Sequence, residues 1–274
     1  MSKLDFITRA DLITDLTRIG IAPGDTVMVH AACNAIGPVL GGPDAIIAAL
    51  RDAVGLQGTL MAYLDWEAPW EDFKDEHGRI PEPLRPHVLP FDPTLTRAAR
   101  QNGTLPEFLR TTPGALRSGN PGASVAALGT KAAWLTADHP LDYGYGPGTP
   151  LARLVEAKGK VLMLGAPLDT MTLLHHAEHP ARLPDKRIIL TEVPFATPDG
   201  IRWRVIEEFD TSNPCIPALP DNFIERIVGD YLATGAGRQG TIGLASSVLV
   251  DAADIMPFAV AWMERAACTE QVAG

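Results

Sequence analysis

The densest group of side chains capable of acid–base chemistry lies between residues 172 and 179. Thr172, His175, His176, Glu178 and His179 all fall within the segment TMTLLHHAEH. Residues three or four apart share one face of a helix, so a helix here places all but His176 on one stripe. An imidazole titrates near neutral pH, and a neighbouring carboxylate favours its protonated form. The stripe therefore predicts a general base.

Two other interpretations of this stripe stay open. Its residues could solvate an exposed helix face, although Leu168, Met171 and Leu174 on or beside it favour an inward orientation. The segment also matches H-x-x-E-H, the pattern of one class of zinc peptidase, with Glu225 as a candidate third ligand. Pro180 directly follows the second histidine and favours an end or kink of the helix there. We therefore expect no metal.

The acidic residues are clustered as well as numerous. The formal net charge is −10, and residues 65–76 carry six carboxylates against one lysine, Lys74. Glu207, Glu208 and Asp210 form a second group. Such a surface repels nucleic acid and attracts a polycation, unless it serves only to keep the protein soluble. A protein that binds polycations without catalysis is a further alternative, although binding alone needs no base.

The remaining patterns point away from several other classes. Gly37, Gly41 and Gly42 free backbone amides for a phosphate, but neither a Walker lysine motif nor G-x-G-x-x-G is present. A G-x-S-x-G hydrolase elbow is also absent. The three cysteines are widely spaced, as is typical of a reducing cytosol. No apolar run is long enough to span a bilayer, and MSKLDFITRADL lacks the apolar core of a signal peptide. We expect a cytoplasmic protein without a membrane partner.

The order of predicted elements indicates one α/β domain over residues 1–274. Strands alternate with helices, which implies a mixed, largely parallel central sheet with helices on both faces and a β-hairpin extension. Ligands of such folds bind beyond the carboxyl ends of the strands, where His30, Trp66 and the turn 165–169 are expected. Residues 67–95 show no periodicity. The expected strands are 25–31, 59–66, 123–129, 160–165 and 242–250, with hairpin strands 186–195 and 201–210 around TPDG. The expected helices are 9–19 (capped by Thr8 and Gly20), 43–54, one opened by Thr104 and Glu107, 150–159, one capped by Asp169, 220–233 and one capped by Asp251.

Several longer motifs match one known family. They are VHAACNAIGPVLGGP, the strand ending in Trp66, FDP at 91–93, RSGNPGAS, LDYGYGPGTPLARLV, GAPLDTMTLLHHAEH, EEFDT and DAADI. On these motifs the chain resembles the aminoglycoside 3-N-acetyltransferases, whose fold differs from that of the GNAT acetyltransferases. The resemblance runs from about residue 10 to 265.

The resemblance implies direct transfer of an acetyl group from acetyl-CoA to the 3-amino group of a 2-deoxystreptamine aminoglycoside, a polycation. It makes His175 the general base, Glu178 its orienting carboxylate and Thr172 the contact at the thioester. It implies no metal and a monomer or homodimer. The positions along the CoA cleft are His30, Ala31, Asn34, Ala35, Ile36, Gly37, Arg117 and Ser118, and those on the aminoglycoside side are Trp66, Glu67, Asp210 and Glu225.

The chain departs from the family pattern at two positions. Asn34 stands where relatives usually have lysine, and Gly122 where they have Asp or Glu. The second position belongs to the substrate side, where Asp65 or Glu67 could supply the missing charge. An N-acetyltransferase acting on another amine, in antibiotic biosynthesis, is therefore an open alternative.

Overall fold

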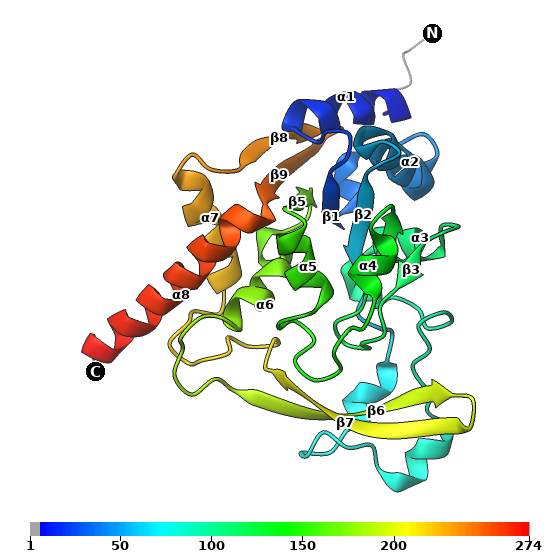
Figure 1. Ribbon diagram of the computed structural model, residues 1–274, viewed down its shortest axis with the longest axis vertical. Coiled ribbons are helices and arrows are strands. Elements are labelled where there is room, and N and C mark those ends of the chain that lie inside the picture. Colours follow the sequence, from blue (N-terminus) through cyan, green and yellow to red (C-terminus); the bar gives the residue numbers. More distant parts are fainter. Residues whose placement is uncertain (1–5, 274) are drawn as a thin grey trace.

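A seven-stranded sheet runs through the middle of the molecule, described here from a computed structural model of residues 6–273 with side chains for residues 6–268 (Figure 1). The strand order is β3-β4-β2-β1-β5-β9-β8. β1 pairs in parallel with β2 and β5, whereas β4 and β9 run in the opposite direction to all the others. The mixed, largely parallel sheet is therefore confirmed. Its strands are β1 (Thr26–Ala31), β2 (Thr59–Tyr63), β3 (Leu116–Arg117), β4 (Val125–Gly129), β5 (Lys160–Leu164), β8 (Arg238–Ile242) and β9 (Ala245–Asp251).

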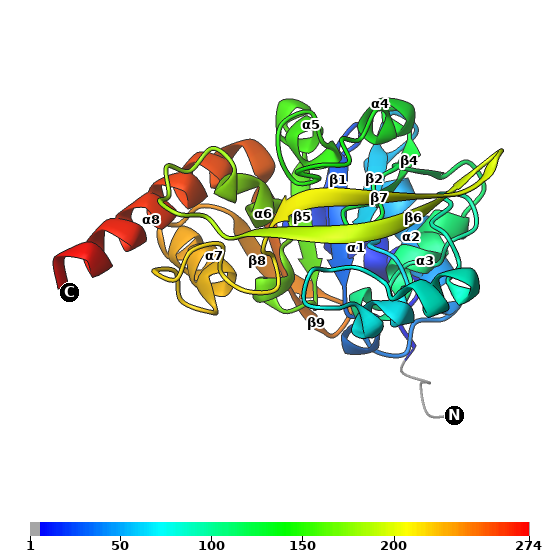
Figure 2. The same cartoon turned by 90° about the horizontal axis from the view of Figure 1, so that it is seen from below.

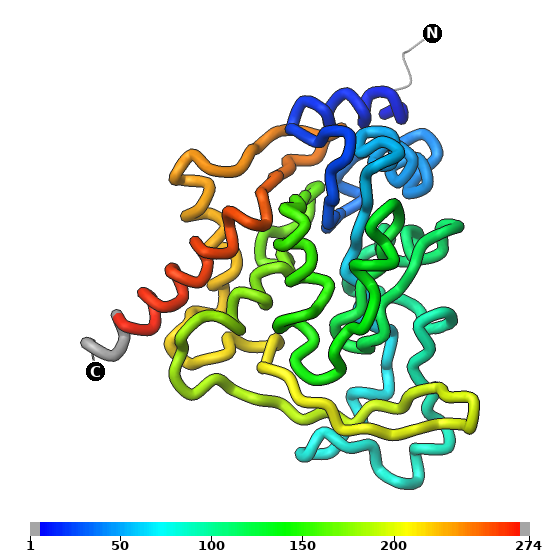
Figure 3. The backbone as a smooth tube through the Cα atoms, in the orientation of Figure 1, coloured from blue at the N-terminus to red at the C-terminus, as the bar shows by residue number. Residues whose placement is uncertain are grey.

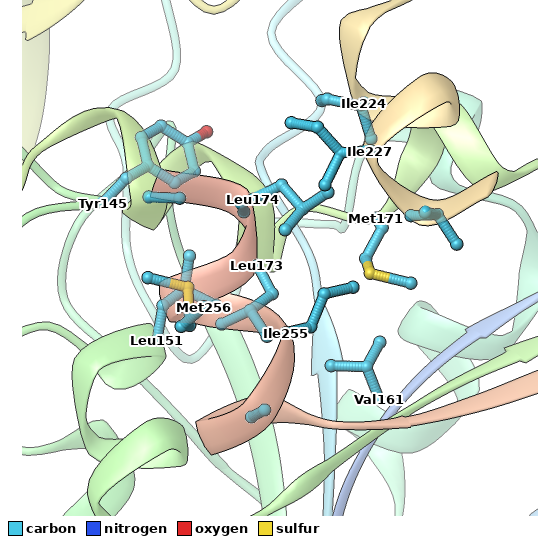
Figure 4. Close-up of a cluster of buried hydrophobic side chains, with 14 of the residues drawn as sticks. Tyr145, Leu151, Val161, Met171, Leu173, Leu174, Ile224, Ile227, Ile255 and Met256 are labelled. Carbon is cyan, nitrogen blue, oxygen red and sulfur yellow. The ribbon is translucent and has the colours of Figure 1, made fainter. Parts of the chain in front are cut away.

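Helices cover both faces of the sheet, as predicted. Successive strand side chains point to opposite faces, so Val27 and Val29 join one buried cluster while Met28 joins the other. Each fully buried aliphatic side chain contributes about 1.5–3 kcal/mol to stability. The first cluster packs against α1 (Arg9–Ile19), α2 (Gly42–Val54) and α3 (Thr104–Thr111), and the second, drawn in Figure 4, against α4 (Ala132–Thr136), α5 (Pro150–Glu156), α6 (Leu173–Glu178), α7 (Phe223–Ala233) and α8 (Ala252–Ala273).

The alternation of side chains along a strand determines which face of the sheet His30 and Tyr63 point to. His30 is two residues beyond Met28 on β1, and Tyr63 is two residues beyond Met61 on β2. Both therefore project from the carboxyl ends of adjacent parallel strands toward the face that α6 covers. This is the position at which α/β sheets bind ligands.

The predicted caps of two helices are confirmed, and those of two others are wrong, although α3 does begin at Thr104 as expected. Thr8 and Asp11 form a reciprocal capping box on α1, and Thr149 caps α5. Thr104 forms no capping box, because Gly103 occupies the cap and the Glu107 carboxylate binds arginines and the amide of Ala98 instead. Asp169 lies in a short 3₁₀ turn, and α6 begins only at Leu173. Among the helices described, none is long and apolar enough to cross a membrane.

The predicted hairpin is present but does not extend the central sheet. β6 (Ile188–Thr197) and β7 (Gly200–Phe209) form a separate two-stranded sheet, so the mixed character of the central sheet comes from β4 and β9. The hairpin crosses in front of the ends of the central strands (Figure 2). The other short elements are 3₁₀ turns at Cys33–Ile36, Pro69–Phe73, Glu82–His87, Arg100–Asn102 and Leu168–Thr170.

The segment without periodicity, residues 67–95, packs beside the hairpin, and together we call them the outer layer (Figure 3). The Phe91 amide donates to the Pro194 carbonyl at 2.8 Å, and the Glu192 amide donates to the Gly78 carbonyl at 2.9 Å. The guanidinium of Arg85 binds the buried Glu192 carboxylate at 2.7 Å. A small core of Trp66, Phe91, Val193 and Ile206 fills the layer. The segment is ordered by a partner about 100 residues away in the chain, so local patterns could not reveal it.

We predict that Glu192→Gln loosens the outer layer and spares the sheet. The substitution removes the negative charge that pairs with Arg85 in a nearly buried position, where a lost partner costs several times more than at the surface. Hydrogen exchange of the amides in 78–92 and 191–196 should accelerate, while that of β1 should not. Glu82→Gln is the matched control, because Glu82 contacts the same arginine but its side chain is 88% exposed. Equal acceleration in both variants would contradict the assignment.

Candidate functional site

The predicted base and its carboxylate meet on α6. His175 Nδ1 lies 3.1 Å from Glu178 Oε1, one helical turn away. Glu178 is 1% exposed, whereas the histidine keeps partial access to solvent. With Nδ1 donating to the carboxylate, Nε2 is left as a proton acceptor. The pair therefore has the arrangement of a general base oriented by a buried acid.

α6 is held by apolar packing on one side and by polar contacts on the other. Leu173, Leu174 and Ala177 are fully buried in the cluster shown in Figure 4. The His175 ring lies 5.4 Å from the ring of Tyr145. Thr172 precedes the helix, and its hydroxyl reaches only the Thr170 carbonyl at 3.4 Å, a long distance that leaves it available to another partner.

The other two histidines of the helix hold neighbouring segments. His176 Nδ1 lies 2.7 Å from the Tyr145 carbonyl, and His179 Nε2 lies 3.6 Å from Glu208. The His179 ring also packs against Phe209 at 4.7 Å. Burial lowers the pKa of His179 to about 4. Both side chains are thus structural and mostly shielded from water.

An acidic cavity of about 190 Å³ opens beneath the outer layer. Tyr63 and Tyr145 line its inner end, and carboxylates line its walls. Its principal polar lining residues are Asp65, Glu71, Asn120, Thr191, Glu208 and Thr211.

Two of these carboxyl groups are strongly affected by burial. Burial raises the pKa of Asp65 to about 7 and also that of Glu208 to about 7. Asp65 has a left-handed φ of 51°, and its carboxylate accepts from the amide of Trp66 at 2.8 Å. A cationic ligand strongly stabilises the charged form of a buried carboxyl group whose pKa is raised, because the charge of the ligand replaces the hydration lost on burial. The cavity is therefore suited to a polycation.

A second cavity of about 190 Å³ lies at the ends of β1 and β5. His30, Ala31, Asn102 and Ala166 line it, and Tyr63 lines both this cavity and the acidic one. Burial lowers the pKa of His30 to about 4, so its imidazole is neutral. The two cavities thus share Tyr63 as a lining residue.

Only two buried side-chain atoms within the described part of the chain lack a hydrogen-bond partner. They are His30 Nε2 and Glu178 Oε2. An unpaired buried polar atom costs about 1–3 kcal/mol, and it is tolerated mainly where function requires it. Both atoms belong to the predicted site.

The residues predicted along the CoA cleft divide into those at the second cavity and those away from it. His30 and Ala31 line the cavity, and Asn34 and Ala35 are exposed on the turn that follows β1. Ile36 is buried in the core, and Gly37 ends the turn with a φ of 97°.

Arg117 and Ser118 serve the framework. Arg117 donates to the carbonyls of Asp65 and Thr96, and thereby fixes the loop that carries the acidic residue. Burial lowers its pKa to about 10. Ser118 is fully buried and its hydroxyl lies 2.9 Å from His139 Nδ1.

The four residues predicted on the substrate side do not line the acidic cavity. Trp66 is buried against Trp70 and Phe91. Glu67 binds the side chain and amide of Arg100. Asp210 accepts from the amide of Ser212 and from the side chain of Asn213, and so closes a turn. Glu225 lies on α7 and lines a different cavity, together with Asp169.

Tyr63 and Tyr145 line the cavity without having been predicted from the sequence, and Glu208 was expected only as a member of an acidic group that attracts a polycation. Tyr63 is the last residue of β2, where the sheet binds ligands, so its position was a usable signal. Tyr145 lies in the irregular LDYGYGPG segment and Glu208 on the hairpin. Neither carries a local signal for its distant neighbours.

The zinc-peptidase pattern does not assemble a ligand set. His175 faces Glu178 and Tyr145, His179 faces Glu208, and Glu225 lines the separate cavity. Across the described residues no group of three or more His, Cys, Asp or Glu could hold a metal ion.

Known proteins are similar to this chain in sequence and in fold over nearly its whole length. Residues 28–264 match the family described as Aminoglycoside 3-N-acetyltransferase. Aminoglycoside N(3)-acetyltransferase VII of Streptomyces paromomycinus is 47% identical, over 94% of this chain and 92% of that protein. The solved structure "AAC-IIIb binary with CoASH" is similar with a TM-score of 0.94 and 64% identity, over 95% of this chain and 97% of that one. "AAC-VIa bound to Sisomicin" is similar with a TM-score of 0.88 and 37% identity, over 94% and 98%.

We predict that neutralising either buried carboxyl group stabilises the ligand-free protein at alkaline pH. Between about pH 4, where the unfolded group titrates, and about pH 7, where the folded group does, the folded state binds more protons. Stability contributed by the group is therefore lost as pH rises through this window. Asp65→Asn and Glu208→Gln should raise the free energy of unfolding by about 1–3 kcal/mol at pH 8, and by much less near pH 4.

Urea unfolding at the two pH values measures this difference. Glu76→Gln is the control, because its side chain is 87% exposed and should show no gain. A loss of stability at pH 8 in both cavity variants would mean that the carboxylates are well compensated in the free protein.

Proposed function

Because the chain belongs to the aminoglycoside 3-N-acetyltransferase family, we propose that it acetylates the 3-amino group of 2-deoxystreptamine aminoglycosides with acetyl-CoA as donor. Membership of this family makes it an acetyltransferase, and the natural consequence of the reaction is antibiotic resistance. The contact between His175 and the buried Glu178 is the observation that carries the mechanism.

His175 acts as the general base in this proposal. An aminoglycoside amine must lose a proton to attack a thioester, and Nε2 accepts that proton while Nδ1 holds its own toward Glu178. The nitrogen adds to the acyl carbon and forms the C–N bond. When the carbonyl re-forms, the C–S bond breaks and the electron pair of that bond leaves with the sulfur of CoA. The buried carboxylate stabilises the imidazolium formed in this step.

The acidic cavity binds the acceptor. Asp65, Glu71 and Glu208 line it and offer charge-assisted hydrogen bonds to ammonium groups. A relative solved with sisomicin, an aminoglycoside, bound to it supports this assignment. Three of the predicted substrate-side residues act indirectly in this proposal, because they fix the loops that carry the cavity-lining residues. They are Trp66, Glu67 and Asp210.

The second cavity and the turn from His30 to Gly37 receive the thioester end of the donor. A relative solved with CoASH supports acetyl-CoA as the second substrate. Thr172, at the start of α6, has a weakly bonded hydroxyl that can turn to this end. Since the two cavities adjoin at Tyr63, donor and acceptor can be bound together.

Direct transfer fits the lining of the two cavities better than an acetyl-enzyme intermediate. Among the described residues that line them, none is a cysteine, serine or lysine, and none of the three threonines there, Thr170, Thr191 and Thr211, is hydrogen-bonded to a histidine. A covalent mechanism needs an activated nucleophile beside a base. The acetyl group therefore passes from sulfur to nitrogen within a ternary complex.

The same chemistry on another amine is the second candidate. It is favoured by Gly122, which lines the acidic cavity without a side chain at a position where the family resemblance implies a carboxylate. One fewer negative charge suits an acceptor with fewer ammonium groups.

Thiol release from acetyl-CoA tests the proposal, with a panel of aminoglycosides and simpler diamines as acceptors. We expect release with 2-deoxystreptamine aminoglycosides, acetate on N3 by NMR, and intersecting double-reciprocal plots. Parallel plots would indicate an acetyl-enzyme. Release only with other amines would favour the second candidate.

We predict that His175→Ala lowers kcat by about 10²–10⁴-fold at pH 7 with little change in either KM. The base acts mainly in the transition state, and the deficit should shrink at alkaline pH as more of the amine becomes neutral. His176→Ala, which loses only the contact with the Tyr145 carbonyl, should cost far less. A near-normal kcat for His175→Ala would place the base elsewhere.

We predict that Gly122→Asp lowers the aminoglycoside KM about threefold to tenfold and leaves the acetyl-CoA KM unchanged. A Cβ at Gly122 meets no atom within 4 Å, so the side chain fits without strain and adds a carboxylate to the cavity. Gly119→Asp is the matched control, since its Cβ is equally unobstructed and it is exposed outside the cavity. Equal effects of both would indicate only long-range attraction.

A further inference from the structure

Among the residues that the structure describes, Tyr63 alone is in the lining of both cavities. It ends β2 on the face covered by α6, and it lines both the acidic cavity and the cavity beside His30. Its ring lies 6.3 Å from that of Tyr145, which in turn lies 5.4 Å from the His175 ring. A group at this junction is close to where an acyl carbon and an attacking amine must come together.

The Tyr63 hydroxyl belongs to a compact group of three polar atoms. It lies 2.7 Å from the Tyr145 hydroxyl and 2.8 Å from the Gly122 carbonyl oxygen. The Tyr145 hydroxyl lies 3.0 Å from the same carbonyl. Two hydroxyl protons serve three short contacts, so only two of these can be hydrogen bonds at any moment.

Three contacts for two protons allow the pairing to be rearranged. When Tyr145 donates to the Gly122 carbonyl, that part-buried acceptor keeps a hydrogen bond, and the Tyr63 proton can exchange its contact with the Tyr145 oxygen for one to a ligand. Burial raises the pKa of Tyr63 well above its usual range, so the hydroxyl remains a donor at working pH. The pair therefore presents one prepared donor at the junction.

We propose that the Tyr63 hydroxyl donates a hydrogen bond to the thioester carbonyl oxygen of the acetyl donor during transfer. This rests on the proposed acetyltransferase function. As the amine nitrogen bonds to the acyl carbon, the π electron pair moves to the oxygen, and the phenol stabilises the charge there. When the carbonyl re-forms, the C–S pair leaves with sulfur, the amine proton resides on His175, and Tyr63 keeps its own proton throughout. Tyr145 is a positioning residue, because it frees Tyr63 from the Gly122 carbonyl.

Tyr63→Phe tests the donor, because it removes one oxygen and keeps the ring. A single donor to a developing oxyanion is worth about 10²–10³-fold in kcat, with both KM values nearly unchanged. Tyr145→Phe is the matched control and should cost only about tenfold or less, since Tyr63 keeps its proton. Because Tyr145 acts through Tyr63, the double variant should be no slower than Tyr63→Phe alone.

Fluorotyrosines incorporated at position 63 provide a measurement that a change in packing alone would not affect. Single-turnover rates, taken below the phenol pKa of each analogue, should rise as the phenol becomes more acidic, by about two- to fivefold across the series. The same analogues at position 145 should give a flatter dependence. Thermal unfolding and acetyl-CoA titration of Tyr63→Phe check that fold and donor site persist.

Each outcome decides between distinct conclusions. An unchanged kcat in Tyr63→Phe, or a loss confined to the aminoglycoside KM, would overturn the donor role while leaving the acetyltransferase intact. A flat fluorotyrosine series at position 63 would do the same. Absence of thiol release by the wild-type protein with every acceptor would instead overturn the proposed function itself.

Discussion

The contact between His175 and Glu178 is the constraint on which the rest of the site depends. A carboxylate that is 1% exposed needs a partner, and in this protein one of its oxygens has only the imidazole while the other has none. Burying such a pair costs free energy unless its geometry is fixed. The fixing is done by apolar packing, since Leu173, Leu174 and Ala177 anchor the same short helix in the core beneath it. Packing of the apolar side of α6 thus supplies the stability that keeps its polar side, with His175 and Glu178, in a fixed position.

The central sheet determines where two ligands can be bound near that pair. Parallel pairing of β1 with β2 and β5 brings three carboxyl ends together, and strand alternation turns His30 and Tyr63 toward α6. The reversed strands β4 and β9 flank these three strands, and the loop that leads into β4 lies at the same end, where Asn120 and Gly122 line the acidic cavity. The hairpin and residues 67–95 then cover the opening, so that carboxylates far apart in sequence line one cavity.

What the sequence predicts well here is what depends on neighbours in the chain. The capping box of Thr8 and Asp11, the hairpin around residues 197–200, and the spacing that joins His175 to Glu178 all follow from separations of a few residues. Predictions failed where a partner outside the expected pattern competed. Glu107 has capping-box spacing, yet its carboxylate binds Arg97 and the Ala98 amide before the helix and Arg110 one turn later. Asp65 and Glu208 line one cavity although 143 positions separate their numbers, and no local pattern encodes that. The placement of Glu225 on a different cavity is a limit of the same kind.

The acidic cavity also explains why the outer layer is built as it is. Asp65 adopts a left-handed backbone and has a raised pKa, and both features oppose folding of the free protein. They persist because other groups over-determine the loop: Arg117 binds the Asp65 carbonyl, and Trp66 is locked between Trp70 and Phe91. Glu208 is placed from the opposite side by the hairpin, whose own position depends on Arg85 and Glu192. Free energy from the aromatic core and the buried ion pair thus holds carboxyl groups in a state that a cationic ligand would relieve, and this ties affinity for such a ligand to the integrity of the layer that carries Glu71 and Glu208.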